Sequence, residues 1–273
     1  MNFLKLILAI GVIMCAVSCL HSKNVTVTNS GNTKVIIGNT TVNDGSTTII
    51  SGSNIIISGN PIKGNNDITM TEIPLKPFDS ISTGIGGDIT YHHGDEHKVV
   101  VTTDSNIIEF VVTKVSDKVL SLTLAEGSYS PTKLNFDIFT PELKNITISG
   151  SSDFTTKDTI QTSKFQINLN GSGTIKGKFE VENLIANLSG SGNMTASGKT
   201  NNLNIALSGA GNFDGKDLNA DDSVVSISGI GNAKIHTTKS LDARVSGVGN
   251  ITYSGNPANL SKNVSGVGKI RSI

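Results

Sequence analysis

The densest group of side chains that could carry chemistry lies between residues 92 and 97. It contains His92, His93, Asp95, Glu96 and His97. Imidazole and carboxylate groups are ligands for zinc and other divalent metals. The alternative is a solvated turn around Gly94, whose flexible tip would not hold ligands as rigidly as a metal site requires. We expect the turn between two strands, and we predict no metal site.

Carboxylates in the second half of the chain are the candidates for acid–base catalysis. Such catalysis needs an acid and a base that converge in one groove. The aspartates are instead dispersed: Asp153, Asp158, Asp214, Asp217, Asp221 and Asp222. Arg244 and Arg271 are also well separated, and we interpret Asp221-Asp222 as the cap of a solvated turn. We therefore predict no catalytic residue.

Glycine-rich phrases such as Gly209-Ala210-Gly211 invite comparison with nucleotide-binding loops. The glycine spacing is wrong for such a loop, and no strand–helix context surrounds it. The P-loop, H-E-x-x-H and G-x-S-x-G motifs are also absent from the sequence. We expect no cofactor, and we interpret these glycines as corners of a coil that supply positive-φ positions.

The first 19 residues have the pattern of an export signal. Lys5 precedes an apolar run from Leu6 to Val17 that is too short for a typical membrane-spanning helix. The run ends in Ala16-Val17-Ser18-Cys19, which resembles the lipobox of bacterial lipoproteins, although Ala stands at its first position instead of Leu. We predict that Cys19 is lipidated and anchors the protein to a membrane. The alternative is ordinary cleavage, with Cys19 incidental; Cys15 is the one other cysteine, so no disulfide is expected in the remainder.

The overall composition limits the partners. Lys plus Arg number 22 and Asp plus Glu number 22, so no net charge attracts nucleic acid. Aromatic residues make up 4% of the chain and Trp is absent, which leaves few platforms on which bases could stack. We predict no nucleic-acid partner.

A short phrase recurs seven times from residue 149 onward. It reads SGSSDF at 149–154, NGSGTI at 170–175, SGSGNM at 189–194, SGAGNF at 208–213, SGIGNA at 228–233, SGVGNI at 246–251 and SGVGKI at 265–270. The starts are 18 to 21 residues apart, and a fixed period of this size is typical of a solenoid.

Apolar residues alternate before each phrase, which is the signature of a strand with one face toward a core. The clearest trios are Phe165, Ile167, Leu169; Leu184, Ala186, Leu188; Leu203, Ile205, Leu207; and Leu241, Ala243, Val245. A second apolar column follows six residues later, at Ile175, Met194, Phe213, Ala233, Ile251 and Ile270. The pattern predicts a single-stranded parallel β-helix with coils of about 19 residues. Leu207 should lie sealed between Leu188 and Ile227, with Ala206 facing outward.

The same register predicts a polar column and sets the domain boundaries. Asn193, Asn212, Asn232 and Asn250 occupy one position of successive phrases, so we expect an amide ladder. We divide the chain into a signal peptide at 1–19, a low-complexity, β-rich spacer at 20–71, an N-terminal part with longer, less regular strands at 72–148, and the regular β-helix at 149–273.

Three features together resemble a known family. Phe78 and Ile81 are followed by GIGGDI, Pro141 opens a P-x-L-x-x-I-x-I-S-G-S junction, and the SG-x-G-N coils come after it. This order is similar to the head GIN domain family, described as a putative auto-transporter adhesin domain of exported bacterial proteins, over about residues 74–270. The resemblance implies an all-β, right-handed parallel β-helix and a role in adhesion. It transfers no motif of binding residues.

These observations lead to one expected function and two alternatives. We expect a non-catalytic lipoprotein of the bacterial cell envelope, facing the surface or the periplasm, whose β-helix binds a surface glycan or a protein. The alternatives are a carbohydrate-active β-helix lyase or hydrolase and a purely structural envelope component. A groove with clustered carboxylates would favour the enzyme, and a smooth Ser/Thr/Asn wall would favour binding or scaffolding.

Overall fold

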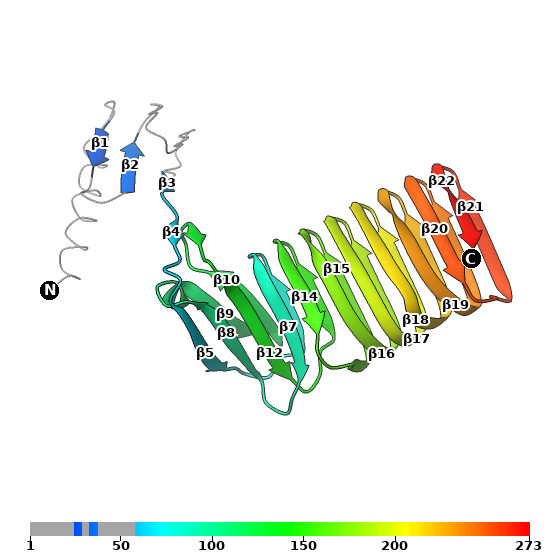
Figure 1. Cartoon of the computed structure of the whole chain (residues 1–273), viewed down its shortest axis with the longest axis horizontal. Coiled ribbons are helices and arrows are strands. Elements are labelled where there is room, and N and C mark those ends of the chain that lie inside the picture. Colours follow the sequence, from blue (N-terminus) through cyan, green and yellow to red (C-terminus); the bar gives the residue numbers. More distant parts are fainter. Residues whose placement is uncertain (1–24, 29–32, 38–57) are drawn as a thin grey trace. The chain divides into compact units, whose positions relative to one another are not determined.

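The repeats fold into a β-solenoid in which each coil lies against the next (Figure 1). The structure is a computed structural model and describes residues 25–28, 33–37 and 58–273. The chain divides into two units, Met1–Ile62 and Lys63–Ile273, with β4 (Ile62–Lys63) at the boundary. Cys19 and the expected signal segment lie outside the described residues.

The first unit contains a small antiparallel sheet. Its strands are β1 (Val25–Thr28), β2 (Thr33–Ile37) and β3 (Ser58–Gly59), and β2 pairs with both of the others. Within the described part of the chain, no helix has the length and hydrophobicity needed to span a membrane.

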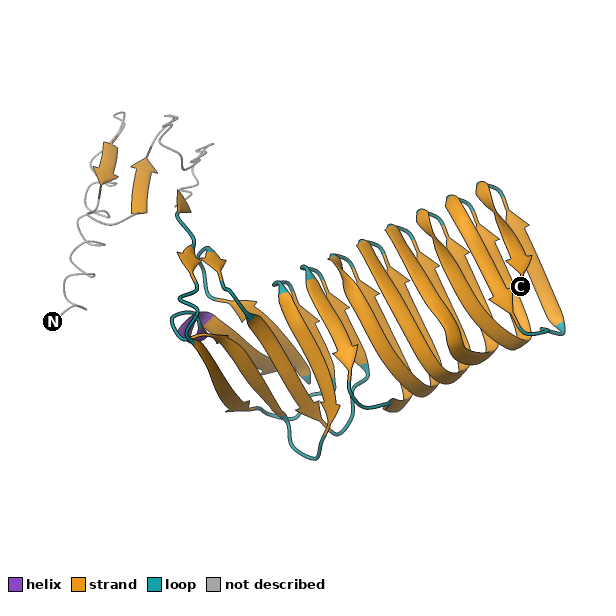
Figure 2. Ribbon diagram, viewed as in Figure 1, coloured by secondary structure: helices purple, strands orange, loops and turns teal. Residues whose placement is uncertain are grey.

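The second unit contains about seven solenoid turns. Its parallel strands are β13 (Asn145–Ile148), β14 (Ser152–Thr156), β15 (Ile160–Leu169), β16 (Ser172–Leu188), β17 (Ser191–Leu207), β18 (Ala210–Ile227), β19 (Ile230–Val245), β20 (Val248–Ser254), β21 (Asn259–Val264) and β22 (Val267–Ser272). Each long strand runs around most of one coil, and short loops remain at the Ser-Gly corners (Figure 2). The predicted register is confirmed, because Leu207 pairs with Leu188 on one side and Ile227 on the other.

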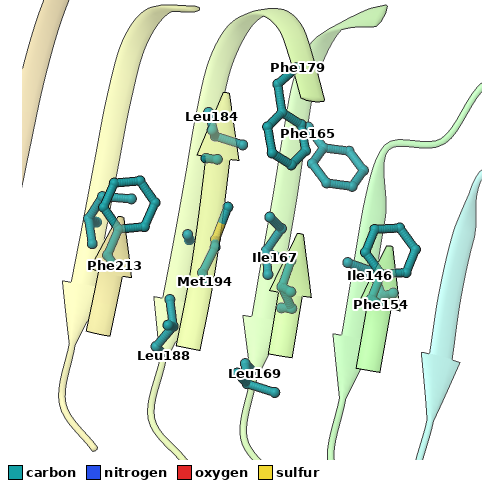
Figure 3. Close-up of a cluster of buried hydrophobic side chains, with 14 of the residues drawn as sticks. Ile146, Phe154, Phe165, Ile167, Leu169, Phe179, Leu184, Leu188, Met194 and Phe213 are labelled. Carbon is teal, nitrogen blue, oxygen red and sulfur yellow. The ribbon is translucent and has the colours of Figure 1, made fainter. Parts of the chain in front are cut away.

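The core consists of the alternating side chains that the sequence predicts. All four trios are buried, and Ile175, Met194 and Phe213 of the second column are at most 1% exposed. Figure 3 shows the two columns converging from facing strands. Leu207 is 1% exposed while Ala206 is only half-buried, so the two faces of the strand are assigned correctly.

The N-terminal part of the second unit is less regular, as expected. Its elements are β5 (Ile68–Pro74), β6 (Ser80–Thr83), β7 (Gly87–His93), β8 (Lys98–Asp104), the 3-10 helix η1 (Ile108–Phe110), β9 (Val111–Ser116), β10 (Val119–Leu124), β11 (Tyr129–Ser130) and β12 (Leu134–Thr140). The pairs β5–β8, β8–β12 and β9–β10 are antiparallel, whereas β6 and β7 pair in parallel with β13 and β14. The compact unit begins at Lys63, and β5, which contains residues 71 and 72, belongs to it.

The corner glycines are needed for a different reason from the one expected. The Ser-Gly-x-Gly glycines do not adopt the left-handed backbone, apart from Gly249 at φ 159°, which is nearly extended. A Cβ added to Gly190 would instead lie 1.8 Å from the carbonyl oxygen of Gly171 on the preceding coil. The close approach of stacked backbones at each corner, rather than positive φ, excludes a side chain there.

Candidate functional site

The histidine cluster does not form one site. His92 and His93 lie within β7, and the turn begins only after them. His92 Nε2 lies 2.8 Å from Asp137 Oδ1, whereas the backbone N–H of His93 donates to Asp158 at 2.9 Å. His97 Nδ1 lies 3.1 Å from Thr140 Oγ1. Among the described residues, no group of three or more His, Cys, Asp or Glu side chains is placed to hold a metal ion.

His92 belongs instead to a row of side chains across three neighbouring strands. Phe139 of β12 pairs with His92 of β7 on one side and Lys98 of β8 on the other. The His92 and Phe139 rings stack at 4.6 Å, and Lys98 Nζ lies 5.4 Å from the Phe139 ring centroid. Ion pairs at 3.2 Å with Glu96 and Glu72 raise the pKa of Lys98. Sequence reasoning missed this row, because Phe139 lies more than 40 residues from His92 and no repeat links them.

The aspartates named as catalytic candidates have separate local partners. Asp153 accepts from the Thr174 backbone, Asp214 from Lys216, and Asp217 lies 4.0 Å from Lys216 Nζ. Asp221 and Asp222 lie within β18 and do not cap a turn of their own. Asp221 pairs with Lys239 at 3.0 Å, and Asp222 accepts from Ser240, so both bind the next coil.

The most regular surface of the solenoid is the SGxGN face, which we define as residues 172–174, 191–193, 210–212, 230–232, 248–250 and 267–269. The predicted amide ladder lies along it. Asn212 Nδ2 donates to Asn193 Oδ1 at 2.9 Å, and the next two steps, through Asn232 and Asn250, are each 3.1 Å. The backbone N–H groups of Asn232 and Asn250 donate to the same oxygens of Asn212 and Asn232, and that of Lys269 donates to Asn250 Oδ1, all at 3.1 to 3.2 Å. Each oxygen of Asn212 and Asn232 therefore accepts two hydrogen bonds, which fixes the side-chain orientation.

An apolar stripe runs beside this ladder. The residue between the two glycines of each corner changes along the stack from Ser172 and Ser191, through Ala210, to Ile230, Val248 and Val267. The last three are 64%, 49% and 71% exposed. Neighbouring exposed apolar side chains of this kind typically mark an interaction surface. These residues are part of the repeats in the sequence, but the stripe that they form was not predicted.

Two shallow grooves follow the ladder. The first has a volume of about 710 Å³ and is lined by the corner glycines, the stripe and the four asparagines of the ladder. The second, of about 340 Å³, contains Asp214, Lys234, Thr252 and Arg271 and is also lined by three of these asparagines, Asn212, Asn232 and Asn250. The face thus offers apolar contact, amide N–H donors and charges of both signs.

The opposite face of the solenoid is largely a polar wall. Gln166, Asn168, Asn187, Ala206 and Ser226 face outward along it, and Asn187 donates to Asn168 at 3.0 Å. Its groove of about 600 Å³ contains Asp222 and Asp242. Asp242 is held by Arg244 Nη2 at 2.6 Å, so the two carboxylates are not arranged as a free acid–base pair.

The fold recurs in solved crystal structures. One described as a putative adhesin from Bacteroides fragilis NCTC 9343 has 25% identity and a TM-score of 0.75, covering 78% of this chain and 100% of that chain. A putative adhesin and a putative lipid binding protein from Parabacteroides distasonis ATCC 8503 have 24% and 23% identity, with TM-scores of 0.69 and 0.64. Both cover 78% of this chain and 100% of their own. No curated protein matches the sequence significantly.

A family model covers most of the second unit. The model described as "Putative auto-transporter adhesin, head GIN domain" matches residues 77–257. The match includes η1, the junction after Pro141 and all of the solenoid up to β20. This protein therefore belongs to the head GIN domain family of adhesin-like proteins.

Proposed function

We propose that this protein is a non-catalytic, ligand-binding lipoprotein of the bacterial cell envelope, and that it binds through the SGxGN face. The family and the similar crystal structures support an adhesin-like role at the cell surface. The ligand that we propose is a surface glycan or an extended protein segment. Such a ligand would follow the long axis of the face and contact several coils.

The observation that carries this proposal is the change along the stripe. The same corner position holds serine in two coils and Ile or Val in three others, and the parallel pairing at these corners keeps the same register. Folding therefore does not require an apolar side chain there. About half or more of each of these three apolar side chains is exposed, so burying the rest contributes little to folding. A partner that covers the stripe therefore explains the apolar residues better than folding does.

Binding is tested by restoring serine at the three positions. The chain from residue 24 is screened against immobilised glycans, matrix proteins and lipids. We expect the Ile230→Ser, Val248→Ser, Val267→Ser triple variant to keep its thermal midpoint and to lose affinity at least about tenfold. Val224→Ser is the matched control, because Val224 is 45% exposed on the opposite face. Equal binding by the triple variant would exclude the stripe as the site.

The proposed anchor is Cys19. Stable attachment requires two lipid signals, since a single acyl chain binds only marginally. In a bacterial host given labelled fatty acid, we expect label on the wild-type chain and none on Cys19→Ser, which should leave the membrane fraction. Label retained by Cys19→Ser would mean that the anchor lies elsewhere.

The absence of catalysis is also a proposal with a direct test. Each of the candidate aspartates has its own local partner, as described above, and we expect no turnover of neutral or acidic polysaccharides. Turnover that a single aspartate substitution abolishes would favour the lyase or hydrolase alternative.

A further inference from the structure

The last described coil of the solenoid has an exposed edge. In the described chain, β21 pairs in register with β19, and β22 pairs in register with β20. No strand stacks on the far side of this coil in the described residues (Figure 1). Leu260 and Val264 are 46% and 44% exposed, although their equivalents one coil earlier, Leu241 and Val245, are 2% and 1% exposed. An edge with unpaired backbone groups and apolar side chains is a template for another strand.

A lysine occupies the core position of this end. Lys262 pairs with Ala243, and the same inward column holds Val225, Ile205, Ala186 and Ile167 in earlier coils. The neighbours Ser261 and Asn263 occupy the outward positions of the strand. The register therefore places Lys262 on the side of the strand that faces the core. It is the one charged residue in this column from Ile167 to the last described coil.

The Lys262 side chain reaches across the open core to the facing strand. Its Nζ lies 4.7 Å from the centroid of the Tyr253 ring, which belongs to β20 and is 5% exposed. A cation over an aromatic face is a favourable contact that keeps the ammonium group partly hydrated. The lysine therefore covers the end of the core without being buried in it.

We propose that Lys262 is a gatekeeper that prevents this exposed edge from pairing with a second copy of this chain. A strand stacked on β21 would bury the ammonium group, and two copies meeting end to end would bring two such groups into one core. Burying an unpaired charge is strongly unfavourable. The other end is built differently, from the antiparallel pairs β5–β8 and β9–β10.

The test is to remove the charge and measure the molar mass. The compact unit Lys63–Ile273, which holds the entire described core, is compared as wild type, Lys262→Leu, Lys262→Met and Lys262→Arg by analytical ultracentrifugation over a concentration series. The comparison is repeated with the exported chain. Lys269→Leu is the matched control, because Lys269 lies in the same coil on the outward side.

We expect dimers or longer end-to-end assemblies for Lys262→Leu and Lys262→Met, with an association constant at least about tenfold above wild type. Wild type, Lys262→Arg and Lys269→Leu should remain monomeric at the same concentrations, and circular dichroism should show the same strand content for all. Folded monomers for both Lys262→Leu and Lys262→Met would overturn the proposal, as would equal association by Lys269→Leu. Loss of strand content in both apolar variants would also overturn it, since Lys262 would then be required for folding.

Discussion

Two buried polar side chains, Asp104 and Ser223, differ in their partners. The Asp104 carboxylate accepts hydrogen bonds from the backbone N–H of Asn66 and from the backbone and hydroxyl of Thr132, at 2.6 to 2.8 Å. The Ser223 hydroxyl has no hydrogen-bond partner among the described residues, although the side chain is 2% exposed. Asp104 therefore fastens the start of the compact unit to the loop before β12, while Ser223 leaves a polar group unsatisfied in the core.

Asp104 should make the folding stability of the protein depend on pH. Desolvation raises the pKa of the Asp104 carboxyl, but the hydrogen bonds from Thr132, Asn66 and Lys133 outweigh it, and the net pKa is lowered. A lowered folded-state pKa adds stability above the unfolded-state value of about 4, and this stability is lost as pH falls through the folded-state pKa. We expect the denaturation midpoints of wild type and Asp104→Asn to differ most near pH 7 and to converge as the pH falls below the unfolded-state value of about 4. A constant difference would contradict this prediction.

Removing the hydroxyl of Ser223 should increase the stability of the fold. It lies in an inward column between Leu203 and Leu241. An unsatisfied buried hydroxyl costs about 1–3 kcal/mol, so we expect Ser223→Ala to raise the free energy of unfolding by about 1 kcal/mol in denaturant titration. Ser226→Ala, on the outward face of the same strand, is the control and should change it by less than about 0.5 kcal/mol. A destabilised Ser223→Ala would show that the hydroxyl has a partner.

At the scale of the strands and corners, repetition decided what could be predicted from the sequence. The trios around Leu188 and Leu207, and the ladder through Asn212, recur in register, so the stacking direction and the inward face follow from alternation alone. The antiparallel strands before Pro141 have no repeat, and the contacts of Phe139 with His92 and Lys98 depend on pairings between distant segments. The conformation of the corner glycines could not be predicted from the sequence either, because it depends on the distance between neighbouring backbones.

The corners predict a contrast between two glycines. Gly190→Ala would place a Cβ 1.8 Å from the Gly171 oxygen, whereas a Cβ on Gly84 would have no neighbour within 4 Å. Overpacking of this kind typically costs about 1–3 kcal/mol. We expect Gly190→Ala to lower the free energy of unfolding by at least that amount and Gly84→Ala to leave it nearly unchanged. Equal effects in urea titration would mean that the stacked backbones separate freely at the corner.

At the scale of the whole second unit, antiparallel strands form one end of the stack and the coil of β21 and β22 forms the other. Each coil contacts mainly its neighbours, as in other solenoids. The contribution of a core leucine should therefore depend on its coil. Leu207 lies between two coils, whereas Leu260 lies in the last one and is 46% exposed.

The position along the stack predicts the effect of truncating a leucine. Leu207→Ala should cost about 2–5 kcal/mol through lost transfer energy and the cavity left behind. We expect Leu260→Ala to cost less than half as much, and the outward Ala206→Ser about 0.5 kcal/mol or less. Denaturant unfolding of the three variants measures this. A larger cost for Ala206→Ser than for Leu207→Ala would mean that the inward and outward faces of the strand are assigned the wrong way round.

The asparagine ladder has a direction, and this direction bears on how the solenoid is assembled. At every step from Asn212 to Lys269 the later coil donates and the earlier coil accepts. A chain is synthesised from its N-terminus, so each new coil brings its N–H groups to an oxygen that is already in position. Aligned hydrogen bonds polarise one another, which makes that oxygen a better acceptor as the row lengthens. The ladder thus favours growth of the solenoid coil by coil from its N-terminal side.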